Sequence, residues 1–558
     1  MQPGCTSPSL PTRQPAESKV SQTFTPPRYA WRPAPEQTGG LAQTHPVIVI
    51  GAGPVGLTAA LDLAARGVRV VVLDDNDTVS TGSRALCYAK RTLEVWDRLG
   101  CGESVAAAGI RWQVGKVYFR DEMVYRFDLL PEPDHKMPAM VNLQQYHLEQ
   151  TLVERCLASD LIDLRWRHRV VSLEQDAGLV RLGVDTPEGS YPAAASWVIA
   201  CDGANSDTRA MVGAPFTGQA FQDRFLIADV LMKAEFPTER WFWFDPPFHP
   251  GQSALLHKQR DNVWRIDFQL GWDADPVEER KPERVEARVR QMLGPDADFE
   301  LEWVSIYQFA CRRIDRFRYG RVLFAGDSAH QVSPFGARGA NSGVQDIDNL
   351  AWKLQCVLAG VAPETLLDSY HDERALAADD NIRNSTRSTD FITPKNAPSR
   401  LFRDAVLGLA RDHSFARPLV NSGRLSLPTR YTNSPLITVD VDPFDAPSAA
   451  PGAPCPDAPV ALPDGRPGWL LERLGSGFTL LVVGNAPPLD DSAAWPVPLA
   501  CLRAGHDFHD RAGVLASRLD ARGQAVYLIR PDQFIAARWR SPSVDDIRVA
   551  LARSLALH

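Results

Sequence analysis

The sequence predicts an α/β protein with an inserted antiparallel sheet, and three observations support this fold class. An apolar run at residues 47–50, a glycine-rich turn, an Ala/Leu-rich helix at 54–66 and a second apolar run at 68–73 form one β–α–β unit. Residues 263–268 alternate between apolar and polar, which is typical of half-buried antiparallel strands. Apolar residues at helical spacing across 344–358 predict a long helix.

Composition shifts divide the chain further. Residues 1–43, rich in Pro, Ser, Thr and Gln, predict a disordered or loosely docked arm. Residues 441–463, dense in Pro, Ala and Asp, predict a linker. A small unit follows at 464–558, with strands at 478–483 and 525–529 and a helix near 544–555. The domain built on the β–α–β unit is expected at 44–113, 141–220 and 310–400, the inserted sheet domain at 114–140 and 221–309, and a helical connection at 401–440.

The composition argues against several classes of function. A net charge of −8 and the absence of any Lys/Arg block argue against a nucleic-acid partner. No apolar run approaches the ~18 residues that a membrane span needs. Nine scattered cysteines, without CxxC pairs or Cys/His clusters, predict no metal site and a location in the reducing cytoplasm.

The first glycine motif is Gly51-Ala-Gly53-Pro-Val-Gly56, between the first strand and helix. Gly51 permits a tight turn, Gly53 lets the backbone approach a pyrophosphate, and Gly56 allows close packing of helix and strand. Asp74 ends the next strand, where a carboxylate suits a ribose hydroxyl pair. Its neighbour Asp75 is the alternative for that role.

Two more motifs follow predicted buried strands. Asp202-Gly203 comes after a strand at 196–200, and Gly326-Asp327 comes after a strand at 321–325. The second continues through a glycine-rich loop at 334–343 into the long helix, where backbone N–H groups can face an electron-rich ring edge. Read alone, the Asp-Gly pair is a capped turn and the loop another phosphate site.

Together the three motifs resemble the class A flavoprotein aromatic hydroxylases, most closely the subgroup with phenol 2-monooxygenase and 3-(3-hydroxyphenyl)propionate hydroxylase. That subgroup continues its GD motif as GxNxGxxDxxNLxWKL, and residues 339–354 read GANSGVQDIDNLAWKL. The resemblance is strong over residues 45–400 and looser in the tail. It implies a Rossmann-like FAD-binding domain, an inserted substrate-binding domain and a C-terminal thioredoxin-like domain. Because Cys455 has no CxxC partner, we expect that last domain to serve packing or dimerisation.

The resemblance also implies which residues bind FAD. Arg84 would lie near the pyrophosphate, Gln145 near the ribityl chain, and Asp202 in a motif serving both FAD and the nicotinamide coenzyme. Asp327 would bind the ribityl chain. The full expected set is Gly51, Gly53, Gly56, Asp74, Arg84, Gln145, Asp202, Gly203, Gly326, Asp327, Gly339, Ala340 and Asn341. His330, just after the GD motif, would position the flavin or serve the structure.

The reaction implied is hydroxylation of a phenolic or hydroxyaromatic-acid substrate by NADH or NADPH and O₂, through a flavin C4a-hydroperoxide. The expected catalytic candidates are Tyr307, His257 and Arg265 in the inserted sheet, although a packing role remains the alternative for each. Strand alternation puts Arg265, Asp267 and Gln269 on one face. An arginine in the pocket would fit a substrate carboxylate. A homodimer is also expected.

Two other functions stay open from the sequence. One is another FAD-dependent oxidoreductase, an oxidase or a halogenase-like enzyme. Residues 241–246, WFWFDP, superficially resemble the WxWxIP segment of halogenases but lack Ile-Pro. The other is a non-catalytic FAD-binding protein, against which the intact motifs argue.

Overall fold

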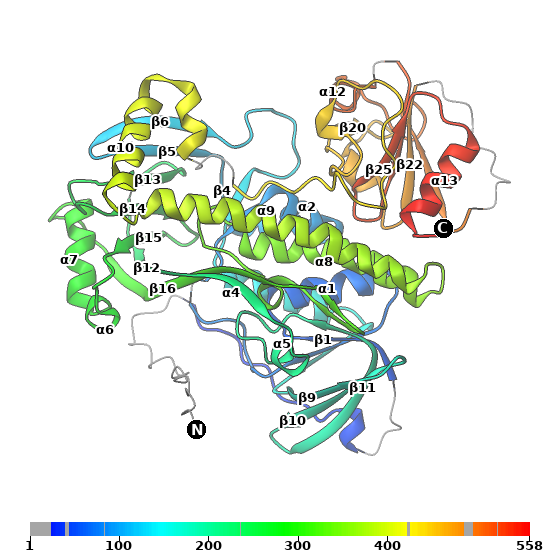
Figure 1. Cartoon of the computed structure of the whole chain (residues 1–558), viewed down its shortest axis with the longest axis horizontal. Coiled ribbons are helices and arrows are strands. Elements are labelled where there is room, and N and C mark those ends of the chain that lie inside the picture. The colour runs from blue at the N-terminus through cyan, green and yellow to red at the C-terminus, as the bar shows by residue number, and fades with distance from the viewer. Residues whose placement is uncertain are drawn as a thin grey trace, which may run out of the picture.

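The computed structural model describes residues 24–38, 44–82, 84–234, 236–420, 425–484, 495–521 and 523–557. Figure 1 shows three parts: a sheet with helices in the lower part of the view, an inserted antiparallel sheet, and a C-terminal unit on the opposite side from that inserted sheet. Within the described ranges, no helix combines the length and apolar character that crossing a bilayer requires.

The nucleotide-binding sheet has eight strands, and its central strands run parallel. β1 pairs with β2 on one side and with β11 on the other, and β11 pairs with β18. The carboxyl ends of these strands therefore meet at one edge of the sheet. Its strands are β1 (Thr44–Ile50), β2 (Val70–Asp74), β8 (Ile162–Trp166), β9 (Arg169–Gln175), β10 (Val180–Thr186), β11 (Gly189–Ala200), β17 (Arg318–Tyr319) and β18 (Val322–Phe324).

Helices cover this sheet and enclose the apolar core. The predicted β–α–β unit is present, and the buried faces of α1 and α8 pack against the strands. The helices of this part are α1 (Pro54–Ala65), α2 (Lys90–Arg98), α3 (Gly102–Ala108), α4 (Gln145–Leu157), α5 (Asp207–Met211), α8 (Gly339–Leu358), α9 (Asp368–Ile392) and α10 (Ala397–Asp412). A small sheet of β3 (Cys87–Ala89), β4 (Ile110–Trp112) and β7 (Met140–Asn142) adjoins them.

The inserted sheet also has eight strands, in the order β19-β16-β12-β15-β14-β13-β5-β6. One face, including Trp264, Ile266 and Phe268, packs on α7. The other face, including Phe242 and Phe244, packs toward α9, α10 and Phe335. The elements are β5 (Val114–Phe119), β6 (Glu122–Asp128), β12 (Phe216–Leu231), β13 (Arg240–Phe244), β14 (Ser253–Lys258), β15 (Val263–Leu270), β16 (Glu300–Ile314), β19 (His330–Gln331), α6 (Pro276–Glu279) and α7 (Pro282–Leu293).

The C-terminal unit contains a four-stranded sheet with the order β23-β22-β24-β25. The strands expected at 478–483 and 525–529 and the last helix are present. Its elements are β20 (Pro459–Ala461), β21 (Pro467–Trp469), β22 (Phe478–Val483), β23 (Leu499–Arg503), β24 (Ala525–Ile529), β25 (Ile535–Trp539), α11 (Leu470–Arg473), α12 (Val514–Arg518) and α13 (Val544–Ser554). The segment expected to be a linker hydrogen-bonds to this sheet, since Gly452 N–H donates to the Ile535 carbonyl at 2.8 Å.

Buried ion pairs join the C-terminal unit to the rest of the protein. Arg530 pairs with Glu373 of α9, and Glu373 also accepts Nζ of Lys353 of α8 at 2.8 Å. Arg91 of α2 bonds Asp348 of α8 and the Asp532 carbonyl. The unit is therefore fastened to the middle of α8 rather than tethered loosely.

Part of the N-terminal arm is docked on the nucleotide-binding sheet. Tyr29 stacks on Trp166 with ring centroids 4.6 Å apart, and Glu36 accepts hydrogen bonds from Arg165 at 3.0 Å and His45 at 2.7 Å. Residues 1–23 and 39–43 of the expected arm lie outside the described residues.

Candidate active site

The first two motifs lie against each other. A Cβ built on Gly51 would come 2.5 Å from the carbonyl oxygen of Cys201, and one on Gly56 would come 1.9 Å from the Gly51 carbonyl. Gly51 also has a φ of +102°, which L-residues with side chains rarely adopt. The glycines are thus required for the tight turn and for its contact with the Asp202 turn.

The third motif joins them through Val55 of α1. A Cβ on Gly326 would meet a Val55 methyl carbon at 3.0 Å, and one on Gly343 would meet it at 2.6 Å. No protein atom lies within 4 Å of a Cβ built on Gly53, so that side of the first turn is open. The three separated turns therefore converge at one edge of the sheet.

Asp74, and not Asp75, contacts the first glycine turn. Its Oδ2 accepts the Ala52 N–H at 2.5 Å, and its Oδ1 accepts the Asn76 N–H at 2.8 Å. Burial raises the pKa of Asp74 above its ordinary value, although these hydrogen bonds act in the opposite direction. The side chain of Asp75 is exposed.

Asp202 holds its own turn. Its Oδ2 accepts the Thr208 N–H at 3.0 Å, and its Oδ1 accepts the Ser206 hydroxyl at 2.7 Å, at the start of α5. Gly203 has a φ of +78°, as a turn of this kind requires. The carboxylate of Asp202 is therefore engaged inside the protein.

We infer that Asp327 and Tyr307 line a hollow. Both side chains are exposed, Tyr307 by 40%, yet burial is the largest cause raising the pKa of each. A side chain can be both accessible and desolvated where it lines a concave surface. Asp327 further raises the pKa of Tyr307, while Arg84 and Arg265 lower it, so these three charged groups lie near the Tyr307 side chain.

Gln145 fixes the segment that follows Arg84. Its Oε1 accepts the Ala85 N–H at 2.9 Å and its Nε2 donates to Glu149 at 2.7 Å. Both polar ends of Gln145 are thus used within the protein. The Arg84 side chain is exposed, and its carbonyl accepts Nη1 of Arg265 at 3.5 Å.

The N-terminus of α8 also belongs to the site. The helix starts at Gly339 and Ala340 without a side-chain cap, which leaves N–H groups for a ligand. Asn341 instead ties this end to β3: its Oδ1 accepts the Ala89 N–H at 2.8 Å and its Nδ2 donates to the Cys87 carbonyl at 2.9 Å. A Cβ on Gly339 would lie 3.9 Å from Oδ1 of Asp327, so the loop borders the hollow.

Three basic side chains form a row on the face of the inserted sheet that is directed toward the three converged motifs. His257 pairs in register with Arg265. Trp241 pairs with Leu256 on antiparallel strands, so the adjoining residues Arg240 and His257 are also neighbours. We call Arg240, His257 and Arg265 the basic row. Burial, then Arg240 and Arg265, lower the pKa of His257 well below its ordinary value, so its imidazole is neutral near pH 7.

Two acidic residues, Asp267 and Asp229, lie next to the basic row and have different hydrogen-bond partners. Asp267 accepts Nε of Arg265 at 2.8 Å. Asp229, opposite Arg265 on β12, accepts Nε2 of Gln259 at 3.0 Å, and burial raises its pKa to about 7. The prediction that Arg265 and Asp267 face away from Trp264, Ile266 and Phe268 is confirmed.

The sequence prediction missed Arg240 and Asp229. Arg240 begins an alternating strand, Arg240–Phe244, in which Arg240, Phe242 and Phe244 are buried on one face. This alternation was a usable signal for Arg240. Asp229 lies in the apolar last part of the strand Phe216–Leu231, where only its burial marks it out.

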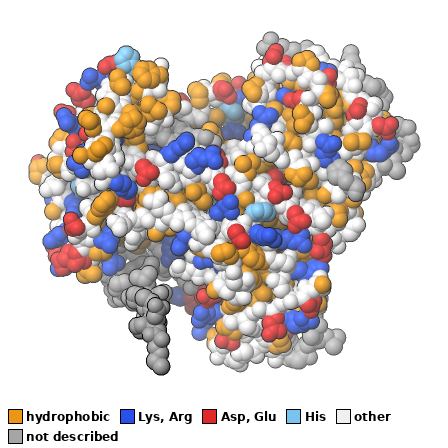
Figure 2. All heavy atoms as spheres, viewed as in Figure 1, with side chains coloured by type: hydrophobic (Ala, Val, Ile, Leu, Met, Phe, Trp, Pro, Cys, Tyr) orange, Lys and Arg blue, Asp and Glu red, His pale blue; other side chains and the backbone are white. Residues whose placement is uncertain are grey.

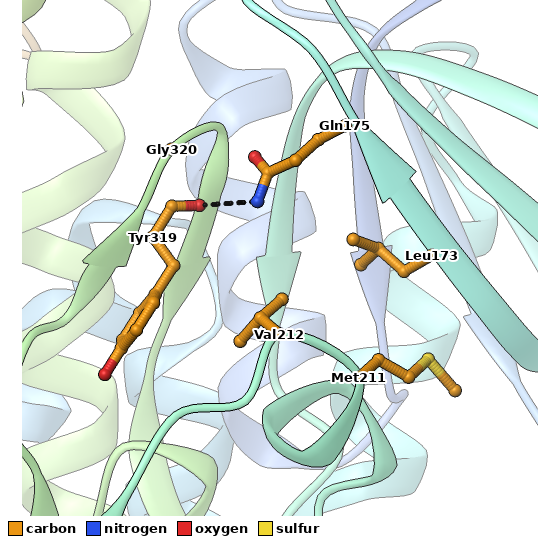
Figure 3. A pocket seen from close by; sticks show the side chains of 6 residues that line it. All are labelled: Leu173, Gln175, Met211, Val212, Tyr319 and Gly320. Carbon is orange, nitrogen blue, oxygen red and sulfur yellow. Dashed lines mark hydrogen bonds between the residues drawn. The ribbon is translucent and has the colours of Figure 1, made fainter.

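Two cavities formed by the described residues lie away from the converged turns. Figure 3 shows one, about 350 Å³ in volume, between β9, α5 and the β17–β18 turn, where the amide of Gln175 bonds the Tyr319 carbonyl. The other, about 390 Å³, lies between α2 and the C-terminal unit. Neither is lined by a predicted site residue. In the described part of the chain, no His, Cys, Asp and Glu side chains gather as a metal site.

The converged turns fit a dinucleotide cofactor. The open space beside Gly53 and the N-termini of α1 and α8 suit phosphates and an electron-rich ring edge, and the Asp327 side chain reaches the hollow. These are the properties that the FAD-type motifs imply.

Comparison with known proteins agrees with this geometry. The family model described as "FAD binding domain" matches residues 44–385. A 12-dehydrotetracycline 5-monooxygenase/anhydrotetracycline 6-monooxygenase of Streptomyces rimosus subsp. rimosus is 30% identical, covering 88% of this chain and 94% of that protein. A 3-(3-hydroxy-phenyl)propionate/3-hydroxycinnamic acid hydroxylase of Mycolicibacterium smegmatis is 25% identical, covering 90% and 92%. The crystal structure of the flavin-dependent monooxygenase PieE with FAD and substrate superposes with a TM-score of 0.80 at 25% identity, covering 92% and 100%.

Proposed function

The chain belongs to the FAD-binding aromatic monooxygenase family, and we propose that it hydroxylates a phenolic or hydroxyaromatic-acid substrate with NAD(P)H and O₂. As a member of that family it is an FAD-dependent aromatic monooxygenase. The proposal of a phenolic or hydroxyaromatic-acid substrate rests on the basic row. This row lies on the face of the inserted sheet that is directed toward the three converged motifs.

In this proposal the converged turns hold FAD. Gly53 leaves room for the pyrophosphate, Gly51 and Gly56 allow the tight turn, and Asp74 keeps that turn in place through Ala52. Asp327 faces the ribityl chain, and the N–H groups at the start of α8 face the flavin ring. Gln145 and Asp202 hold the neighbouring segments in place, because their polar atoms bond to Ala85 and to the start of α5.

When bound, FAD supplies the electrons that activate O₂ for transfer of one oxygen atom to the ring. The chain's own groups orient the substrate. Tyr307, whose pKa is raised, stays protonated near pH 7 and can donate a hydrogen bond. Loss of the phenol proton raises the electron density of the ring. Arg265 stabilises the negative charge that results.

Two arginines support a docking place for the anionic nicotinamide coenzyme. Arg209 and Arg312 lie over the ring of Phe216, at 4.0 and 4.6 Å from its centroid. Within the described chain neither forms an ion pair with a carboxylate, and burial lowers the pKa of both. Two like charges held together without a counterion favour an anionic ligand such as the coenzyme's phosphates.

A screen of phenols and hydroxyaromatic acids tests the function. The holoenzyme should oxidise NADH or NADPH faster with a suitable phenol, and hydroxylated product should equal coenzyme consumed. Oxidation without hydroxylated product from any phenol would contradict the proposal and favour an oxidase.

The C-terminal unit is proposed to be thioredoxin-like and redox-silent. A mixed sheet with α12 and α13 supports the first part, and burial of the Cys455 thiol, which raises its pKa, supports the second.

An apolar surface supports the expected homodimer. Figure 2 shows apolar side chains gathered over α10 and the adjoining 3₁₀ helix Ser414–Val420. Exposed residues there are Leu401, Phe402, Leu409, Phe415 and Leu419. Light scattering would measure the oligomeric state.

A further inference from the structure

We propose that Arg240 and His257 form an anion-binding subsite that selects substrates carrying a second acidic oxygen group, beyond the hydroxyl of the ring that reacts. The inference rests on the proposed function, since it places that group in the substrate site of an aromatic monooxygenase.

The first argument is that both side chains are buried without partners. Arg240 is 9% exposed and His257 is 3% exposed. Among the described residues, neither side chain forms a hydrogen bond or an ion pair, and Nδ1 of His257 is fully enclosed. Buried polar groups in native proteins are almost always hydrogen-bonded, and a buried cation is almost always paired. Two adjacent exceptions therefore indicate a missing ligand.

The second argument is the charge balance of this face. Asp267 already compensates Arg265, with Nε and Oδ1 2.8 Å apart. Asp229 is largely protonated below pH 7, because burial raises its pKa to about 7. His257 is neutral for the same physical reason. Asp267 also acts to raise the pKa of Arg240, but no described carboxylate lies within ion-pair distance of Arg240, so an anion would supply a direct partner.

The third argument is the position of Arg240 beside the converged motifs. Burial raises the pKa of the Cys87 thiol, and Arg240 is the charged group that lowers it most. Cys87 accepts a hydrogen bond from Asn341, at the start of α8, through its carbonyl. Arg240 is thus one residue removed from the loop proposed to face the flavin ring. An anion held there would belong to a molecule lying in the site.

The chemistry of the ligand follows from the two groups. A guanidinium presents parallel N–H donors that match a carboxylate, and it also binds a single oxygen of an acidic enol or phenol. A neutral imidazole adds one donor. Both ligand types occur among the compounds named for the relatives, a hydroxyphenylpropionate and an anhydrotetracycline.

The experiment measures binding by the change in flavin absorbance of the oxidised holoenzyme, without turnover. The probes are 3-(3-hydroxyphenyl)propionate, its neutral amide and anhydrotetracycline. Arg240→Met, Arg240→Lys and the control Arg126→Met are compared with the parent protein. Arg126 is an exposed arginine on β6 of the same sheet.

Removing a charge-assisted hydrogen bond should weaken binding by about tenfold to a hundredfold. If a carboxylate is the ligand, the acid binds at least tenfold more tightly than the amide. Arg240→Met then loses this preference, Arg240→Lys keeps part of it, and Arg126→Met keeps all. If an enol is the ligand, only anhydrotetracycline binding depends on Arg240. The inference is overturned if no probe binds in an Arg240-dependent way.

Two controls keep the outcomes separable. Flavin content and melting temperature show whether each variant is folded, and Arg240→Gln replaces the methionine variant if that one loses flavin. Failure of hydroxylation with Arg240-dependent binding intact would contradict the proposed function alone. Hydroxylation of neutral phenols with no role for Arg240 would contradict this inference alone.

Discussion

His330 lies against Asp346, with Nε2 of the imidazole 2.6 Å from Oδ2 of the carboxylate. The same oxygen accepts the Gly326 N–H at 3.0 Å, and Oδ1 accepts Nε of Arg374 at 2.7 Å. Burial acts to raise the pKa of Asp346, but His330 and Arg374 outweigh it and lower the pKa. One buried carboxylate thus supports the turn that carries Asp327.

Replacing Asp346 by Asn should loosen that turn. The change leaves the Arg374 cation buried without its counterion, so we expect a loss of about 3–5 kcal/mol of stability and weaker flavin retention. Thermal melting and the flavin-to-protein absorbance ratio would measure both. Asp379→Asn removes the partner of Arg313 in a pair whose acid is 47% exposed, and it should cost about 1 kcal/mol or less. Equal effects of the two variants would contradict the assignment.

Replacing Asp327 by Ala should abolish flavin retention. The variant loses the only carboxylate proposed to face the ribityl hydroxyls, and the hydrogen bonds of a charged group are worth about 1.5–3 kcal/mol. Purified protein should be colourless, and titration with FAD should give a raised Kd. Asp185→Ala, at an exposed position of β10, should purify yellow. A yellow Asp327 variant at full occupancy would sink this prediction.

Arg312→Met should raise the KM for the nicotinamide coenzyme about tenfold, with little change in flavin content. Arg312 contacts Gln331 and the Phe216 ring, so its loss removes positive charge without opening a glycine turn. Stopped-flow flavin reduction at several coenzyme concentrations would separate binding from hydride transfer. Arg316→Met, an exposed neighbour, is the control. An unchanged coenzyme dependence would argue against this docking place.

The pKa of Asp229 predicts a pH dependence of stability. Burial raises this pKa from 3.8 to about 7, so the folded protein holds the proton more tightly than the unfolded chain. The stabilising contribution is full below about pH 4 and is lost as the pH rises through 7. Asp229→Asn does not titrate, so its melting temperature relative to the parent should rise across that window. The gain corresponds to at most about 4 kcal/mol.

A melting-temperature difference that stays constant from pH 4 to 8 would contradict the raised pKa. Asp261→Asn serves as the control, because its side chain is 51% exposed and its removal should leave the pH profile unchanged.

Much of the framework follows from local sequence. The β–α–β unit and the strands Phe478–Val483 and Ala525–Ile529 are marked by continuous apolar runs, which burial on both faces requires. The glycine motifs are equally local, because close backbone approach excludes any Cβ. The family resemblance is confirmed by the match over residues 44–385.

Which side chains of the inserted sheet become neighbours in the basic row could not be predicted from a local sequence pattern. Arg240 meets His257 only because β13 and β14 pair with Trp241 opposite Leu256, and register is a property of two strands. Likewise, Gln145 and Asp202 hydrogen-bond to Ala85 and Thr208, and the expectation that they contact the cofactor stays a prediction. Spacing alone does not distinguish a group that touches a ligand from one that holds such a group in place.

Helix α8 connects the cofactor hollow to the C-terminal unit. Its first residues border the cofactor hollow, and its later residues Asp348 and Lys353 fasten the C-terminal unit through Arg91 and Glu373. Ligand binding to the first turn lowers the free energy of the whole folded helix by mass action. Depleting FAD should therefore speed cleavage of the distant C-terminal unit by a protease, and adding FAD back should restore its resistance.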